Sequence, residues 1–197
     1  GERITFIKIC ALSTAKGMVL IMNETKALLN NITFQFNISK QLLEYHLTSL
    51  EQEEYRWCSP NAGLYLKKEA GKWVADLPES EAYHIGTPSI AWTLWHITFW
   101  WEMVLDHSFG EGTLTKSDIK VHENVASVKT AIHSLIVKWE EILANLKEEE
   151  LYSKAYTAFP FNNEVAFHHL ASWLNLELMK NAAEIGYVRF EYASAEK

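Results

Sequence analysis

The chain has 197 residues, of which 48% are hydrophobic, and its formal net charge at pH 7 is -7. This length predicts one domain with a sizeable core, and an acidic chain without a Lys/Arg-dense stretch lacks the electrostatic footprint of a nucleic-acid-binding protein. Two cysteines, Cys10 and Cys58, are too few for a disulfide framework and fit no zinc-type spacing, so we expect a cytoplasmic protein.

Residues 1–21 are expected to form an N-terminal appendage to a single domain at residues 22–197. Lys8 and Lys16 interrupt the apolar character of this segment. No uninterrupted apolar run therefore approaches the roughly 18 residues of a membrane span, and the lysines also disfavour the hydrophobic region of a signal peptide. A degenerate signal peptide is the alternative interpretation of this stretch, and we predict no membrane association.

Four long segments have apolar residues at three- and four-residue spacings, which predicts helices. The expected ranges are 23–55, 89–107, 123–146 and 162–192, the second with Thr87 as its N-cap and the last starting at Asn162 or Asn163. The connection between the first two helices, residues 58–88, contains three of the four prolines and is too long for a tight turn. The sequence therefore predicts an all-α four-helix bundle with a long crossover between helices one and two.

The second predicted helix contains "AWTLWHITFWWEMVLDH", residues 91–107, in which one histidine, His96, lies among four tryptophans. On a helix His96 shares its face with Trp92 and Trp100, so it is expected to be buried. The simplest interpretation is a core histidine whose nitrogens are hydrogen-bonded. Because this helix is apolar around nearly its whole circumference, its second side must be covered by the crossover or by another subunit, and we expect a C2 homodimer.

Two polar residues of the last predicted helix, Glu177 and Asn181, fall on its inward face four residues apart. A buried carboxylate needs a partner or a metal, so Glu177 is expected to bind one, and a structural ion pair with Lys180 or Arg189 is the alternative. If the pair of inward positions is shifted by one residue to Leu176 and Lys180, neither side chain lies on the inward face.

The segments "PSIAWTLWHI" and "NLELMKNAAEIG", joined with the long crossover, resemble the DinB-like superfamily over residues 23–192. This superfamily of four-helix proteins includes metal-dependent thiol transferases. The resemblance implies a metal held by one histidine on the second helix and by two histidines, four residues apart, on the fourth. His96 matches the first position, whereas Glu177 and Asn181 stand where the two histidines should be, so the metal site is expected to be degenerate.

This departure changes the expected chemistry of the site. Three imidazoles suit Zn²⁺ or Ni²⁺, whereas His96, Glu177 and Asn181 form a harder, weaker site that is better matched to Mn²⁺ or Mg²⁺. We therefore expect a divalent metal to be weakly held or absent, and a metal-free hydrogen-bonded triad of the same residues is the alternative.

An apolar pocket for a small molecule or a thiol is expected, and it would be lined by Trp73, Trp92 and Trp100. The sequence thus favours a protein derived from a metal-dependent thiol or small-molecule transferase, and leaves open whether it is an enzyme. The alternative is a non-catalytic small-molecule-binding or dimeric interaction protein on the same bundle.

Overall fold

The structure is a computed structural model that describes residues 2–61, 63–80 and 82–195, with side chains from residue 17 onward except at positions 21 and 83. Four helices are long, and short helices and one hairpin connect them. The elements in chain order are α1 (Glu2–Thr48), α2 (Gln52–Arg56), β1 (Leu66–Glu69), β2 (Lys72–Ala75), η1 (Tyr83–Ile85), α3 (Ile90–Phe109), η2 (Lys116–Asp118), α4 (Val125–Asn145), α5 (Glu148–Leu151), α6 (Ala158–Phe161) and α7 (Phe167–Ala195).

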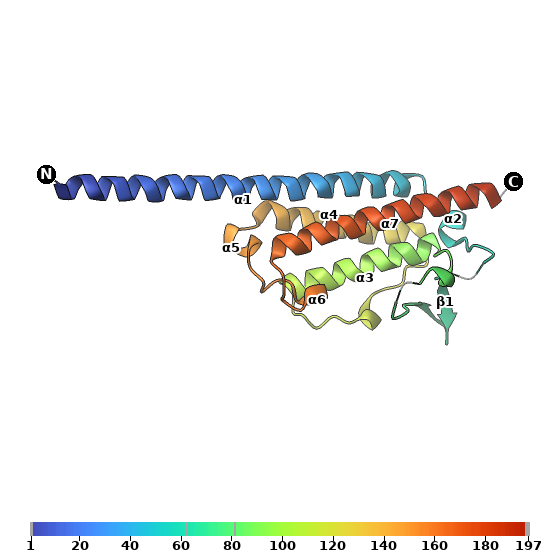
Figure 1. The fold of residues 1–197 in the computed structure, drawn as a ribbon. Coiled ribbons are helices and arrows are strands. Elements are labelled where there is room, and N and C mark those ends of the chain that lie inside the picture. The colour runs from blue at the N-terminus through green and yellow to red at the C-terminus, as the bar shows by residue number, and fades with distance from the viewer. Residues whose placement is uncertain (1, 62, 81, 196–197) are drawn as a thin grey trace.

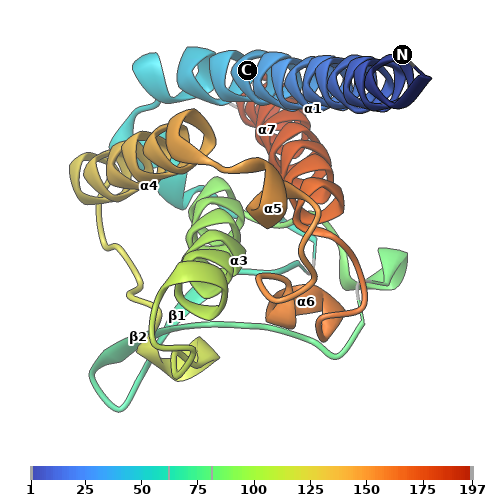
Figure 2. The ribbon, with the colours of Figure 1, turned by 90° about the vertical axis from the view of Figure 1, so that its left-hand side faces the viewer.

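The long helices α1, α3, α4 and α7 are arranged around a common centre in the end-on view of Figure 2, and their buried apolar residues form one core. Phe36 of α1, Trp101 of α3 and Trp139 of α4 are fully buried in it. The Phe36 and Trp101 rings meet edge to face with centroids 6.0 Å apart, an arrangement that aromatic pairs prefer. The fold is therefore predominantly helical, as the spacing of apolar residues predicts.

Helix α1 is longer at its start and shorter at its end than expected. It begins at Glu2 instead of Asn23, and its N-terminal part projects beyond the other helices (Figure 1). It ends at Thr48, after which Gln52–Arg56 form the separate helix α2. That residues 1–21 are an appendage stays a prediction. Among the described residues, no helix combines the length and the apolar character that crossing a membrane would require.

The crossover contains regular structure that the all-α prediction does not include. Strands β1 and β2 pair antiparallel, with Glu69 opposite Lys72. The two residues between them, Ala70 and Gly71, have φ values of 47° and 81°, as a tight two-residue hairpin requires. A small two-stranded sheet therefore lies between α2 and α3.

The crossover covers the second apolar side of α3. Trp92 and Trp95 are buried in a small second core together with Leu64 of the crossover and Ile119 beyond α3. The second apolar side of α3 is expected from the sequence to be covered by the crossover or by another subunit. The crossover packs on it. This helix therefore gives no reason of its own to expect a second subunit.

The starts of two helices differ from their predicted positions. The N-cap of α3 is Ser89 instead of Thr87, because the Ser89 side chain accepts a hydrogen bond from the backbone N–H of Trp92. Helix α7 begins at Phe167 because Asn162 and Asn163 adopt left-handed backbone conformations, with φ values of 50° and 60°.

Candidate functional site

His96 is a buried histidine on α3 with an aromatic neighbour one turn earlier. Its ring stacks on Trp92 with centroids 4.9 Å apart and an interplanar angle of 10°. Burial, together with the positive charge of Lys180 nearby, lowers the pKa of His96 to about 4. The imidazole is therefore neutral at pH 7 and belongs to the interface between α3 and α7.

Glu177 of α7 forms an ion pair within its own helix. Its carboxylate lies 2.9 Å from the ammonium of Lys180, three residues later, and both side chains are partly exposed. Of the two structural partners considered for Glu177, Lys180 is the one present, because Arg189 binds Glu54 at 2.7 Å instead. The helical wheel turns Lys180 off the inward face, yet its charge acts on His96. A long side chain can reach a neighbouring ring from the flank of a helix, which the wheel does not represent.

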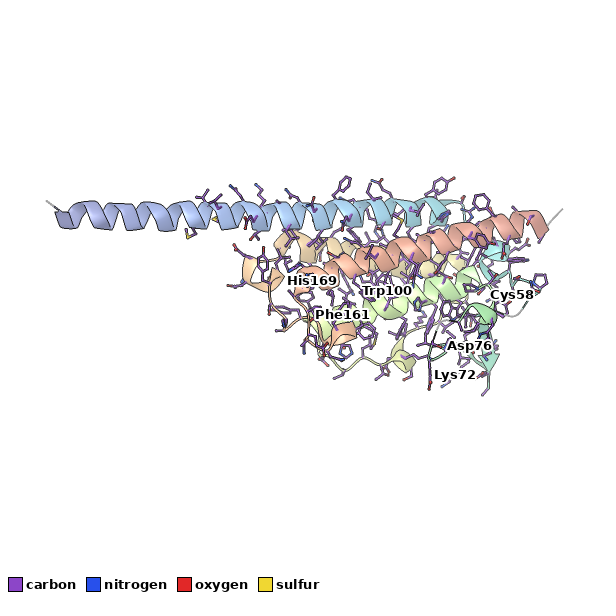
Figure 3. The ribbon with its side chains drawn as sticks, in the orientation of Figure 1. Cys58, Lys72, Asp76, Trp100, Phe161 and His169 are labelled. Carbon is purple, nitrogen blue, oxygen red and sulfur yellow. The ribbon has the colours of Figure 1, made fainter. Side chains whose placement is uncertain are left out.

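Asn181 is buried, and both ends of its amide are hydrogen-bonded. Its Oδ1 accepts a hydrogen bond from the indole N–H of Trp100 at 3.0 Å, and its Nδ2 donates to Glu184 at 2.8 Å. Figure 3 shows Trp100 between α3 and α7. The amide oxygen that could bind a cation therefore has a strong donor from across the helix interface.

The three tryptophans expected to line one pocket lie in two places. Trp100 binds Asn181, and Trp92 stacks on His96 and donates its indole N–H to the backbone carbonyl of Asp76 in the crossover. Trp73 instead lines a separate cavity of about 110 Å³, where the guanidinium carbon of Arg56 lies 4.8 Å from its ring centroid.

A larger cavity of about 780 Å³, which is wide open to solvent, lies between α3 and α4. Its apolar lining includes Leu105 and Leu135, and Glu102 and Lys138 approach it from the two helices. Burial raises the pKa of the Glu102 carboxyl, although the charge of Lys138 opposes this shift. The helical periodicity of the sequence does not predict this cavity.

Two further acidic residues border this cavity, and they differ in how they are held. The Asp106 carboxylate accepts the backbone N–H of Leu114 at 2.8 Å, which keeps its pKa below the ordinary value. Glu141 on α4 is exposed. Asp106 therefore anchors the loop that follows α3, while Glu141 faces solvent at the rim.

The described residues contain no cluster of three or more histidine, cysteine, aspartate or glutamate side chains that could hold a metal ion. The set expected from the sequence consists of His96, Glu177 and Asn181, and the structure gives Glu177 and Asn181 protein partners. The cluster made by His96, Glu177, Lys180, Asn181 and Trp100 is called the α3–α7 cluster below.

These observations define a predominantly helical protein with a buried histidine between its second and last long helices, α3 and α7. Residues 35–185 match the family model described as the DinB superfamily, and the chain belongs to this superfamily. No curated protein and no solved structure gives a significant match.

Proposed function

We propose that this chain is a four-helix DinB-superfamily protein, derived from a metal-dependent thiol or small-molecule transferase, in which a lysine ammonium has replaced the metal ion. The observation that carries the proposal is the position of Lys180, whose ammonium lies 2.9 Å from the Glu177 carboxylate and whose charge acts on His96. The α3–α7 cluster therefore contains a positive charge of its own.

This donor set does not fit a divalent cation. The Lys180 ammonium already places a positive charge beside the Glu177 carboxylate, so it would repel a cation bound to that carboxylate. The Asn181 oxygen would also have to give up the indole N–H of Trp100, which would leave that buried donor unsatisfied. Both costs act against metal binding between His96 and Glu177.

Metal analysis of protein purified without a histidine tag tests this proposal. After dialysis we expect Zn, Ni and Mn well below one ion per chain. The combined variant Glu177→His, Lys180→Met and Asn181→His removes the ammonium and restores two histidines four residues apart, so it should retain more Zn²⁺ than the wild type. Stoichiometric Zn²⁺ in the wild type that disappears in His96→Ala would contradict the proposal.

A second candidate function is the non-catalytic binding of a small molecule, and the cavity between α3 and α4 supports it. Its volume of about 780 Å³ is in the range of small-molecule sites, typically about 300–1,000 Å³. The lining combines apolar side chains with three carboxylates, those of Glu102, Asp106 and Glu141, against a single lysine, Lys138. A ligand with an apolar body and one basic group would complement this lining.

Octylamine is a suitable probe for this cavity, and octanoate is its matched control with the opposite charge. We expect octylamine to raise the melting temperature and octanoate to leave it unchanged, because binding to the folded state stabilises it by mass action. The shift should be smaller in Glu102→Gln. Equal shifts with both probes, or none with octylamine, would argue against an amine site.

A further inference from the structure

Helices α1 and α7 together present an exposed apolar surface. Its members are large side chains that lie on the solvent side of the two helices, with exposed fractions of 66% for Phe34 and 79% for Phe190. The set, called the α1–α7 face, consists of Phe34, Ile38, Tyr45, Leu176, Tyr187 and Phe190.

The six residues lie at matching heights on the two helices. Helices α1 and α7 run side by side in the same direction (Figure 1), and two hydrogen bonds fix their register. Asn175 donates to the carbonyl of Ile32, and Arg189 donates to the carbonyl of His46, each pair being 143 residues apart. In this register Leu176 is level with residue 33, and Tyr187 with residue 44.

Spacing along each helix places the members on one side. Phe34, Ile38 and Tyr45 are four and seven residues apart, so they form one stripe on α1. Tyr187 and Phe190 are three residues apart on α7, and Leu176 is eleven residues before Tyr187, which is about three turns. The two stripes therefore form one surface that runs along the α1–α7 pair.

Charged side chains near this surface are few, and the lysines among them are paired with carboxylates. The sequence contains no charged residue from position 27 to position 39. Lys40 binds Glu140 of α4, and Glu44 lines a cavity with α4 residues, so both lie on the opposite flank of α1. On α7, Lys180 lies in the same stripe, four residues after Leu176, and its ammonium is paired with Glu177 at 2.9 Å. The six members of the α1–α7 face are therefore uncharged, and Lys180 of the α7 stripe has an opposite charge beside it.

The size of the face matches that of a dimer interface. Large aromatic side chains bury about 150–250 Å² each, and four of the six members are aromatic and 63–79% exposed. Together with Ile38 and Leu176 they present on the order of 800 Å². A stable interface buries about 800 Å² per partner, whereas the largest apolar patch of a typical monomer is about 300–600 Å².

We infer that the α1–α7 face is the contact surface between two copies of this chain, related by a two-fold axis. Two acidic chains repel each other, so they can associate most easily through a surface that brings no like charges together. The six members of the α1–α7 face carry no charge, and Lys180 within the α7 stripe is paired with Glu177. The Phe and Tyr side chains of the face are residue types enriched in interface cores. An anionic membrane would instead attract a basic surface.

Sedimentation equilibrium of the full chain between about 1 and 100 µM tests this inference. We expect the wild type to be dimeric. The variant Ile38→Glu with Tyr187→Glu should weaken dimerisation at least 100-fold, because each interface would then bury four carboxylates. The matched control is Val137→Glu, an exposed apolar residue on α4 that lies outside the face. Its dissociation constant should stay within about threefold of the wild-type value.

Further variants separate this face from other surfaces. If the glutamate variant loses its helical circular dichroism, the milder pair Phe34→Gln with Phe190→Gln takes its place. Met18→Glu with Met22→Glu charges the projecting part of α1, where both side chains are exposed. A monomeric wild type, full dimerisation of the face variant, or loss of dimerisation in the Met18 and Met22 variant alone would each overturn the inference. None of these results depends on metal binding.

Discussion

Helix α3 has two different interfaces within the same chain. Toward α7 its polar and aromatic groups meet protein partners, as Trp100 does with Asn181. Toward α4 it borders an open cavity of about 780 Å³, which the partly buried Glu102 helps to line. Two of the residues expected to bind a metal, Glu177 and Asn181, therefore have protein partners on the α7 side, whereas the larger cavity lies on the other side of the helix. Changes toward α7 should cost more stability than changes toward α4.

Trp100→Ala should have the largest effect on the α3–α7 side. The change leaves a void in a fully packed region and removes the donor that binds Asn181. We expect a loss of about 3–5 kcal/mol in the free energy of unfolding, measured by urea denaturation. Leu105→Ala, at the edge of the α3–α4 cavity, is the matched control and should cost about 2 kcal/mol or less because its site is already open. Equal losses would remove the contrast between the two interfaces.

The neutral state of His96 predicts a pH dependence of stability on the α3–α7 side. The folded pKa of about 4 lies below the ordinary value of 6.5. Between these pH values the unfolded chain binds a proton at His96 that the folded chain does not bind. The contribution of neutral His96 to the free energy of unfolding is therefore fully present above pH 6.5 and is lost as the pH decreases toward 4. The loss by pH 4 should be on the order of 3 kcal/mol.

Urea unfolding at pH 7.5, 5.5 and 4 measures this effect in the wild type and in His96→Phe. The variant should lose stability less steeply over this range. His133→Phe, which changes an exposed histidine on α4, should keep the wild-type slope. The other buried histidines remain in all three proteins, so their contributions cancel. Identical slopes in the wild type and His96→Phe would mean that His96 is not held neutral by its surroundings.

A double-mutant cycle on His96→Phe and Glu177→Leu measures the coupling within the α3–α7 cluster. The two residues are connected through Lys180, which pairs with Glu177 and acts on His96. We expect an interaction energy of about 0.5–1.5 kcal/mol, with the double change costing less than the sum of the single changes. A value within about 0.5 kcal/mol of zero would show that Glu177 and His96 are independent.

The sequence predicts the parts of this fold that depend on local periodicity. The four long helices and the long crossover follow from apolar spacing and proline content, and family membership rests on residues that the same segments contain. The end of α1 could not be predicted in this way, because no glycine or proline marks it. Arg189, more than 130 residues away, donates to the carbonyl of His46 and to the hydroxyl of Ser49 as the helix ends.

The candidate site was predicted less completely than the fold, for a related reason. The helical wheel places Glu177 and Asn181 near His96, but it gives only the direction of each Cβ. It cannot show that the Lys180 side chain acts on His96 or that the Asn181 amide binds Trp100. The α3–α4 cavity was missed because it depends on two helices. The one signal in the sequence is that Glu102, Leu105 and Phe109, which line the cavity, lie about one turn apart on α3.

Glu102→Gln should produce the smallest effect, and it tests the α3–α4 side directly. Burial raises the pKa of the Glu102 carboxyl, so the charged form is less favourable in the folded chain than in the unfolded one. Removing the charge should therefore leave stability at pH 7 unchanged or raise it slightly, by less than about 1 kcal/mol. Glu141→Gln, an exposed carboxylate at the rim of the same cavity, should lie within about 0.5 kcal/mol of the wild type. A clear destabilisation by Glu102→Gln in urea denaturation would show that this carboxylate has a stabilising partner. The α3–α4 side would then be as closely paired as the α3–α7 side, and the contrast between the two interfaces of α3 would be lost.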